Sequence, residues 1–455
     1  MRASPLVRAF WQVGAVSVAG ALAACGGSAA MRAAERGDMS ALRGEIGARE
    51  RAGNLTNGEA ADLARVVAAR EVKSAKPEDA AARVRELRGC ARDVDGALAD
   101  RMKTHDEAGA EAALARVESG ELDDGDARAY VSDADEAWRP VGARALTRSG
   151  DREARHRAMV DPSPRVRRQA MRAAQLAKDT GDLEPLTEAA RLDPDPMIRT
   201  EAVRAIAHLP PHGALDVANR LRDLWAAGDE DLREDIALAW ASPDVYPFGG
   251  KDALVVLIAS GHGPGVIEAA AAMVREWDHT DRELVASSVA LIVRTIDSAP
   301  RRGRLHAIAV ARLDRGKDML AAVEKASADD DLHVRVAALS RLTASPPHRA
   351  KAIDQLESFA GGSRDRASSG GALAPHADPL ASRAKMALAS AGDVRIQAWL
   401  EEDLKAPDPY ERLSAASALV ALGRAARGAP LLADDDPSVR TRAACTLMMA
   451  ARIHK

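Results

Sequence analysis

The residues that could carry out chemistry are scattered along this sequence rather than grouped into a site. Its 11 histidines do not recur as His-Glu pairs, and no Gly-x-Ser-x-Gly nucleophile turn is present. The stretch Gly261-His-Gly-Pro-Gly265 lacks the Lys-Ser/Thr that follows a phosphate-binding loop, so it indicates a turn. We therefore expect no catalytic residues, no metal site and no bound cofactor.

The composition favours helices and disfavours nucleic-acid binding. Hydrophobic residues make up 47% of the chain but aromatic residues only 3%, so Ala, Leu and Val must form the core. Such a mixture suits closely packed helices better than sheets. The formal net charge of −4 offers no basic excess to neutralise phosphates.

Arginine and aspartate recur at fixed positions of an internal repeat. The clearest copies are Asp161-Pro-Ser-Pro-Arg-Val-Arg167, Asp193-Pro-Asp-Pro-Met-Ile-Arg199, Asp329-Asp-Asp-Leu-His-Val-Arg335 and Asp434-Asp-Asp-Pro-Ser-Val-Arg440. Weaker copies, one of which contains Asp408 and Arg412, share this register at a usual step of about 28–36 residues.

Each copy predicts a tight turn followed by a helix. Asp and Pro form the turn, and Pro suits the first helical turn because its missing N–H leaves no hydrogen bond unmade. Val or Ile and an Ala four residues later lie on one helix face. One such helix cannot bury this face alone, so we expect pairs of helices to stack into an all-α superhelix.

This pattern resembles the HEAT repeat, in a short bacterial form similar to the bilin-lyase-type repeats, and we assign residues 131–455 to the array. The resemblance implies a ladder of hydrogen bonds between neighbouring repeats. Its arginines would be Arg167, Arg199, Arg335, Arg412 and Arg440, and its turn aspartates Asp195, Asp331, Asp408 and Asp436. The alternative use of the arginines is a ligand-binding stripe along one face of the array.

Three other segments are set apart by their composition. Residues 31–130 are helical by period and propensity, and we interpret them as a section continuous with the array that caps it. Residues 361–378 are rich in Gly and Ser, which predicts a flexible insert. Tyr246 and Phe248 lie in a Pro/Gly-rich stretch, so we expect them to be exposed partner contacts.

The N-terminus resembles a bacterial lipoprotein signal peptide. Arg2 and Arg8 precede the apolar stretch 10–24, which is too short to span a bilayer of about 30 Å, and Leu22-Ala-Ala-Cys25 matches a lipobox. The resemblance implies that residues 1–24 are removed, that Cys25 carries lipid such as palmitate, and that residues 25–30 form a tether. We expect Cys90 and Cys445 to be buried small apolar residues rather than a disulfide.

The sequence therefore predicts a lipid-anchored, non-enzymatic scaffold in the cell envelope. It would present a curved surface to unknown envelope proteins, from the outer membrane or the periplasmic face of the inner membrane. Two alternatives remain open: a cofactor- or metal-handling enzyme related to HEAT-like lyases and hydroxylases, and an architectural envelope protein.

Overall fold

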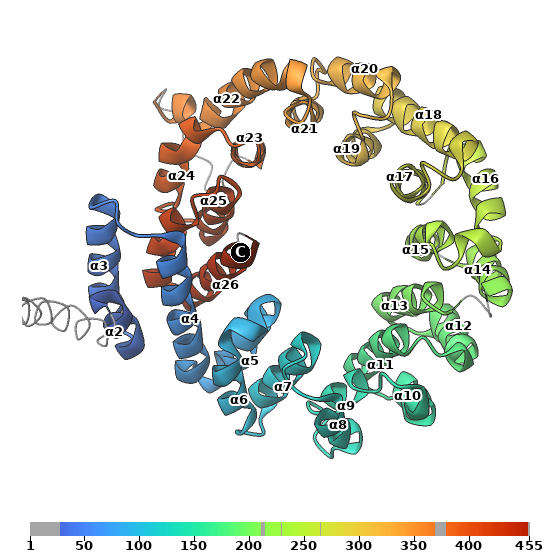
Figure 1. The fold of residues 1–455 in the computed structure, drawn as a ribbon, viewed down its shortest axis with the longest axis horizontal. Helices are drawn as coiled ribbons and strands as arrows, with labels where there is room; N and C mark the ends of the chain where they lie inside the picture. The colour runs from blue at the N-terminus through green and yellow to red at the C-terminus, as the bar shows by residue number, and fades with distance from the viewer. Residues whose placement is uncertain (1–27, 211–213, 229, 264, 369–378, 454–455) are drawn as a thin grey trace, which may run out of the picture.

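The chain folds into a closed ring of helices (Figure 1). This computed structural model describes residues 28–210, 214–228, 230–263, 265–368 and 379–453, and these residues form helices and turns with no strand. No helix among them is both long and apolar enough to cross a membrane. The expected signal peptide and Cys25 lie outside the described residues.

The helices follow one another around the ring in pairs. The N-terminal section contains α2 (Ala29–Arg36), α3 (Met39–Arg51), α4 (Asn57–Ser74), α5 (Pro77–Glu86), η2 (Arg88–Val94), α6 (Asp95–Met102), α7 (Glu107–Ser119), α8 (Asp124–Ala127) and η3 (Arg128–Ser132). The first half of the array contains α9 (Arg139–Arg144), η4 (Ser149–Asp151), α10 (Arg152–Met159), α11 (Pro164–Ala177), η5 (Thr180–Asp182), α12 (Leu183–Leu192), α13 (Pro196–Ala207), α14 (Ala214–Ala227), α15 (Glu230–Ala241), η7 (Tyr246–Phe248), α16 (Gly250–Ser260) and α17 (Val266–Glu276). The second half contains α18 (Arg282–Ser298), α19 (Arg301–Val310), α20 (Lys317–Ala326), α21 (Leu332–Leu342), α22 (Pro346–Ser368), α23 (Pro379–Ser390), η8 (Val394–Ile396), α24 (Gln397–Asp403), α25 (Pro409–Ala421), η9 (Ala425–Ala433) and α26 (Pro437–Ile453).

The repeated Asp-Pro turn starts a helix as its chemistry requires. In α13, the Asp195 side chain accepts a hydrogen bond from the backbone N–H of Met197 at 2.9 Å, and Pro196 occupies the first helical position. Ile198, Ala202 and Ile206 follow at intervals of one turn and are fully buried. The helix thus has one apolar face, which it buries against its neighbours.

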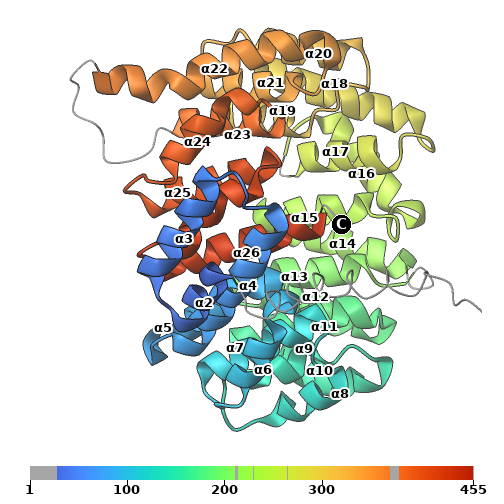
Figure 2. The same ribbon diagram turned by 60° about the vertical axis from the view of Figure 1, so that its left-hand side comes forward.

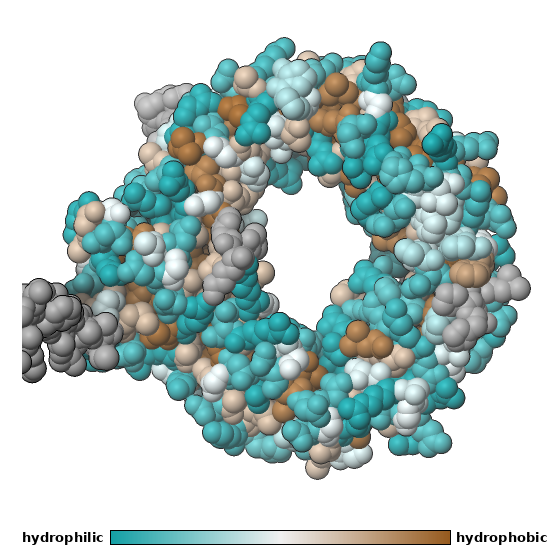
Figure 3. Space-filling view, in the orientation of Figure 1, coloured by the Kyte–Doolittle hydropathy of each residue, from teal (hydrophilic) through white to brown (hydrophobic). Residues whose placement is uncertain are grey.

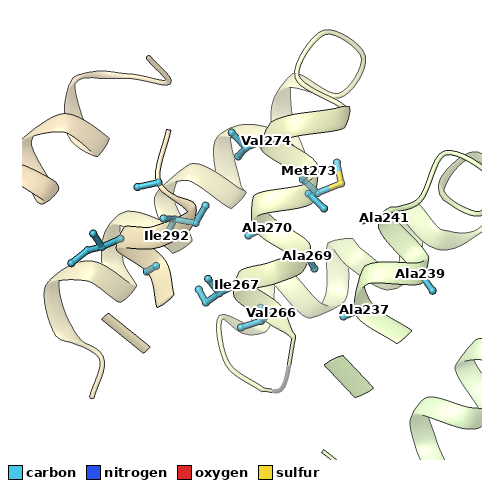
Figure 4. Close-up of a cluster of buried hydrophobic side chains, with 14 of the residues drawn as sticks. Ala237, Ala239, Ala241, Val266, Ile267, Ala269, Ala270, Met273, Val274 and Ile292 are labelled. Carbon is cyan, nitrogen blue, oxygen red and sulfur yellow. The ribbon is translucent and has the colours of Figure 1, made fainter. Parts of the chain in front are cut away.

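The helices form an inner and an outer row (Figure 1). The inner row, which borders the opening, comprises α11, α13, α15, α17, α19, α21, α23 and α25, and the outer row comprises α10, α12, α14, α16, α18, α20, α22 and α24. Alanines let the rows approach closely: Ala237, Ala269 and Ala270 are fully buried between larger apolar side chains (Figure 4). The predicted all-α superhelix is therefore confirmed.

The two ends of the chain meet and close the ring. Helix α26 packs against α4, α5 and η2, while η9 packs against α3 and α4 (Figure 2). One apolar core at this seam combines N-terminal residues such as Leu63 and Val67 with C-terminal residues such as Leu447 and Met448. The interpretation of the N-terminal section as a cap on an open array is therefore wrong. Its helices α4 and α5 pack against α26, the last helix of the array.

A disulfide joins the two ends at the seam. Cys90 of η2 and Cys445 of α26 are bonded, with Cα atoms 5.6 Å apart, although 355 positions separate them in the sequence. Our expectation that both would be unpaired was wrong. In an open array, residues far apart in the sequence are also far apart in space. In a ring, the first and last segments are neighbours.

One segment boundary differs from that expected, and the packing at another shows how the two sections are connected. Helix α22 continues to Ser368, so the first part of the insert 361–378 is helical, and residues 369–378 lie outside the described residues. An apolar core that includes Leu114 and Trp138 crosses the boundary between residues 130 and 131. The N-terminal section is thus continuous with the array in packing as well as in helical content.

Replacing Cys90 and Cys445 together by Ser should lower the free energy of unfolding by about 2–5 kcal/mol, because the disulfide restricts the unfolded chain over most of its length. Urea unfolding of the full chain measures this difference. Thiol titration of the denatured, unreduced Cys25→Ala chain should find no free thiol. Two reactive thiols there would contradict the disulfide.

Ala202→Glu should destabilise the protein by about 3–5 kcal/mol, because Ala202 is fully buried and the new carboxylate would lack a partner. Thr200→Glu, at a half-buried position of the same helix, is the matched control and should cost much less. Thermal melts of both variants test this, and equal melting temperatures would show that α13 does not bury the face assigned to it.

Candidate functional site

The inner-row helices form the wall of a central opening in the ring (Figure 1). Figure 3 shows that the ring remains open when all atoms are drawn, with hydrophilic residues around much of the rim. Several apolar side chains of the inner row are nevertheless exposed, namely Leu176, Met197 and Leu238. The inner row thus combines charged positions with isolated exposed apolar side chains.

Tyr246 and Phe248, the expected exposed aromatic contacts, have different environments. Tyr246 is buried, stacks on Trp277 with ring centroids 4.0 Å apart, and donates a hydrogen bond to Asp281 at 2.6 Å. Burial and then this hydrogen bond raise the pKa of Tyr246. The expectation of exposure was wrong for Tyr246, because η7 turns its ring toward α18, whereas Phe248 is 39% exposed.

All five repeated arginines hold the turn that starts their own helix. Each donates a hydrogen bond to the backbone carbonyl six residues earlier, which satisfies an acceptor at the turn. The bonds run from Arg167 to Asp161 (3.0 Å), Arg199 to Asp193 (3.1 Å), Arg335 to Asp329 (2.8 Å), Arg412 to Ala406 (2.9 Å) and Arg440 to Asp434 (2.7 Å). These arginines are therefore structural side chains of the turns.

A ladder of ion pairs also links consecutive repeats, but it uses the first aspartate of each turn. Arg167 binds Asp193 through two hydrogen bonds of 2.7 and 3.0 Å, and Arg412 binds Asp434 at 2.8 Å. Arg139 binds Asp161 in the same way, at 3.2 Å. Side-chain hydrogen bonding to Asp193 raises the pKa of Arg167, as expected for a guanidinium paired with a carboxylate.

The aspartates that we had assigned to the ladder instead cap their own helices. Asp195, Asp331, Asp408 and Asp436 each accept a hydrogen bond, at 2.8–2.9 Å, from the backbone N–H two residues later. Asp195 and Asp331 have in addition only long ion pairs, with Arg168 at 3.5 Å and Arg301 at 3.6 Å. The assignment was wrong by two residues because the helix cap and the ladder aspartate lie in one short turn.

The ladder continues across the seam with a different acceptor. Arg440 of α26 donates to Glu71 of α4 at 2.7 Å, and both side chains are largely buried. Arg43 of α3 donates to the carbonyl of Ala433 at 2.7 Å, and the backbone N–H of Ala426 donates to Asn57 at 2.8 Å. The seam is thus joined by the same kind of contact that joins neighbouring repeats.

A cavity of about 380 Å³ lies between α7, α9 and α11, lined by the residues Arg85, Arg88, Glu111, Leu114, Pro140, Arg165, Arg168, Gln169 and Arg172. Helix α9 has only 6 residues, whereas its neighbours α7 and α11 have 13 and 14. The short α9 therefore does not fill the space between α7 and α11 along their whole length. Both α7 and α11 border the opening (Figure 1). Five guanidinium groups therefore meet at one place on the inner wall.

Acidic groups gather farther along the same wall. Glu234 of α15 and Glu268 of α17 interact directly, and His306 of α19 lies 2.9 Å from Glu268. Burial and then the charge of Glu268 raise the pKa of Glu234. Among the described residues, no three His, Cys, Asp or Glu side chains converge in a manner suited to a metal ion.

Sequence reasoning missed the arginine cavity, although part of its signal was present. Arg165, Arg168 and Arg172 are spaced three and four residues apart and so share a face of α11. We had considered only the arginine that recurs in every copy. Arg85, Arg88 and Glu111 come from the other side of the cavity, and no local pattern connects them to α11.

Arg440→Ala should lower the free energy of unfolding by about 3–5 kcal/mol, because it leaves the buried Glu71 carboxylate without its partner. Arg442→Ala is the matched control, since Arg442 lies on the same helix, pairs with Glu86 at 3.2 Å and is mostly exposed; it should cost less than about 1 kcal/mol. Urea unfolding compares the two, and a similar loss in both would show that the Arg440–Glu71 pair adds nothing to the seam.

Comparison with known proteins gives one family match and several distant structures. A model of HEAT repeats matches residues 155–241. No curated protein matches the chain. Solved structures include YibA of Escherichia coli (14% identity, TM-score 0.29, 68% of this chain and 95% of that one) and an engineered protein (19%, 0.26, 84% and 98%).

A mutant of Kap121p is a third such structure (12% identity, TM-score 0.24, 81% of this chain and 46% of that one). These scores are low, so the similarity to HEAT repeats depends on the family match over residues 155–241, where helix pairs are seen directly in this fold. The matched segment runs from α10 to α15, and its turns, caps and arginine ladder recur in later repeats. Residues 155–241 are thus similar to HEAT repeats, and the described chain is an all-α superhelix whose two ends are joined.

Proposed function

We propose that this protein is a lipid-anchored, non-enzymatic ring scaffold that binds a partner protein on its inner wall in the bacterial cell envelope. The main observation behind this proposal is that the ring is closed. Closure gives every repeat of the array two neighbours and makes the inner row a continuous wall (Figure 1). Such a wall is an extended binding surface that no single helix pair could provide.

Two observations support a location outside the cytoplasm. Structural disulfides persist in oxidising compartments, and the Cys90–Cys445 bond joins the ends of this chain. The N-terminal stretch with Cys25 resembles a lipoprotein signal, and α2 begins at Ala29, shortly after that cysteine. A lipid on Cys25 would therefore hold the ring close to a membrane surface.

The inner wall is the face that we assign to the partner. It carries exposed apolar side chains at Met197 and Leu238 beside charged groups of both signs. Aromatic residues are few: Trp240 and Tyr246 are packed inside, whereas Tyr410 of the inner-row helix α25 is 74% exposed. Recognition would therefore depend on charge and on single exposed side chains such as Met197 and Tyr410, which favours a partner with charged segments.

Cys25→Ala should release the protein from membranes or leave an uncleaved precursor, because the thiol that carries the lipid is lost. Fractionation of cells followed by intact-mass measurement tests this outcome. Ser28→Ala, close to the same site, is the control and should leave fractionation unchanged. Membrane association of Cys25→Ala at the wild-type level would refute the lipid anchor.

A photo-crosslinking amino acid at Met197, which is 52% exposed on the inner row, should capture a discrete envelope protein in living cells. The same amino acid at Val256, which is 71% exposed on the outer helix α16, is the control and should capture no comparable product. Capture from Val256 alone would place the binding face on the outside of the ring and contradict the proposal.

A further inference from the structure

The arginine cavity between α7, α9 and α11 already holds one carboxylate. The side chain of Glu111 is 1% exposed and accepts hydrogen bonds from Arg88 at 2.8 Å, from Arg85 at 3.1 Å and from Arg165. These three arginines come from η2, α5 and α11, so three separate elements converge on one carboxylate. Charge-assisted bonds of this kind are the strong ones among protein hydrogen bonds.

Further donors at the cavity have incomplete partners. Arg88 Nε and Arg168 Nε are buried and donate no hydrogen bond within the described residues, although Arg88 Nε lies 3.3 Å from a Glu118 oxygen. Among the described residues, Arg168 pairs with Asp195 at 3.5 Å, which is at the limit of a hydrogen bond. Arg168 therefore retains capacity to bind an anion from the solvent side, where its side chain is 34% exposed.

Other carboxylates reduce the charge of this region but do not line the cavity. They pair with the arginines from outside it, and they are Glu107, Glu118, Asp195 and Glu201. Within the lining itself, five guanidinium groups face a single carboxylate. With Glu111, five carboxylates in all pair with the five guanidinium groups, so the excess of positive charge is confined to the lining of the cavity.

The buried amide oxygen of Gln169 needs a hydrogen-bond donor, which a simple anion cannot supply. Its side chain is 5% exposed and lines the cavity, and its amide oxygen accepts no hydrogen bond within the part of the chain that the structure describes. A buried acceptor without a donor is costly, so a ligand that brings an N–H group would be favoured here. A peptide combines a carboxylate side chain with backbone N–H groups a few atoms away.

We propose that this cavity binds an acidic segment of a protein partner, with an Asp or Glu carboxylate on Arg168 and a backbone N–H directed to Gln169. The volume of about 380 Å³ lies at the lower end of known ligand cavities and suits one or two residues rather than a folded domain. This inference rests on the proposed scaffold role and identifies the chemistry that the inner wall recognises.

Fluorescence anisotropy with a labelled hexaglutamate peptide tests the proposal on the full chain in detergent, at an ionic strength of about 0.15 M. A labelled hexaglutamine peptide is the control probe and should not bind. Arg168→Gln should weaken hexaglutamate binding about tenfold, because one charge-assisted contact is lost. Arg204→Gln, the same change on the neighbouring α13, should weaken it less than about twofold.

Glu111→Gln should have the opposite effect. It removes the resident carboxylate, so the arginines that now bind Glu111 become available, and hexaglutamate should bind several-fold more tightly. Glu184→Gln, which removes an exposed carboxylate paired with Arg220 on the outer row, is the matched control and should leave affinity nearly unchanged. Gln169→Met keeps the side-chain volume but not the acceptor, and it should weaken binding as well.

Three results would overturn the proposal. Equal weakening by Arg168→Gln and Arg204→Gln would mean that the peptide follows the general charge of the wall. Inorganic phosphate competing as effectively as unlabelled hexaglutamate would assign the cavity to a phosphate. Absence of hexaglutamate binding at millimolar concentration would exclude the acidic segment, and capture of a partner from Met197 would still leave the scaffold role intact.

Discussion

Every part of this structure depends on the packing of α26 against α4. A stack of helix pairs turns by a small angle at each step, so it closes only when those angles add up to a full circle. Here the last helix packs against α4 of the N-terminal section, and their side chains form one apolar core that includes the disulfide. The curvature of the individual repeats therefore determines whether the two ends can pack against each other.

Much of the fold could be predicted from local chemistry. The Asp-Pro turns, the alternation of Val or Ile with Ala, and the low aromatic content each predict stacked helices, and residues such as Ile198 and Ala202 are buried as their spacing requires. These features depend on residues within one helical turn of each other. The predicted helices therefore agree with the structure through most of the array.

Closure could not be predicted in the same way, because it depends on small angles added over the whole array. For that reason Cys90 and Cys445 appeared unrelated, and the N-terminal section appeared to be a cap. Tyr246 was misjudged for a second reason: a Pro/Gly-rich stretch excludes a long helix, but it does not determine whether a side chain points outward. The ladder aspartates were misassigned because two carboxylates in one turn have similar surroundings and different partners.

The arginine cavity shows how the ring creates a site that no repeat contains. Its lining comes from the N-terminal section on one side and from the first complete repeat on the other, with the short α9 between them. A regular repeat at this position would have filled the gap with a full helix. The irregular part of the array is therefore the place where charged side chains from distant segments meet.

The joined ends also change how the molecule can lose its structure. An open stack of repeats frays first from its two terminal units, which have neighbours on one side only. In this chain α4 of the N-terminal section and the C-terminal helix α26 cover each other, and a disulfide joins α26 to the nearby η2. Among the described residues, α4 and α26 are therefore not exposed as the ends of a stack, and separating them requires breaking contacts of the seam core.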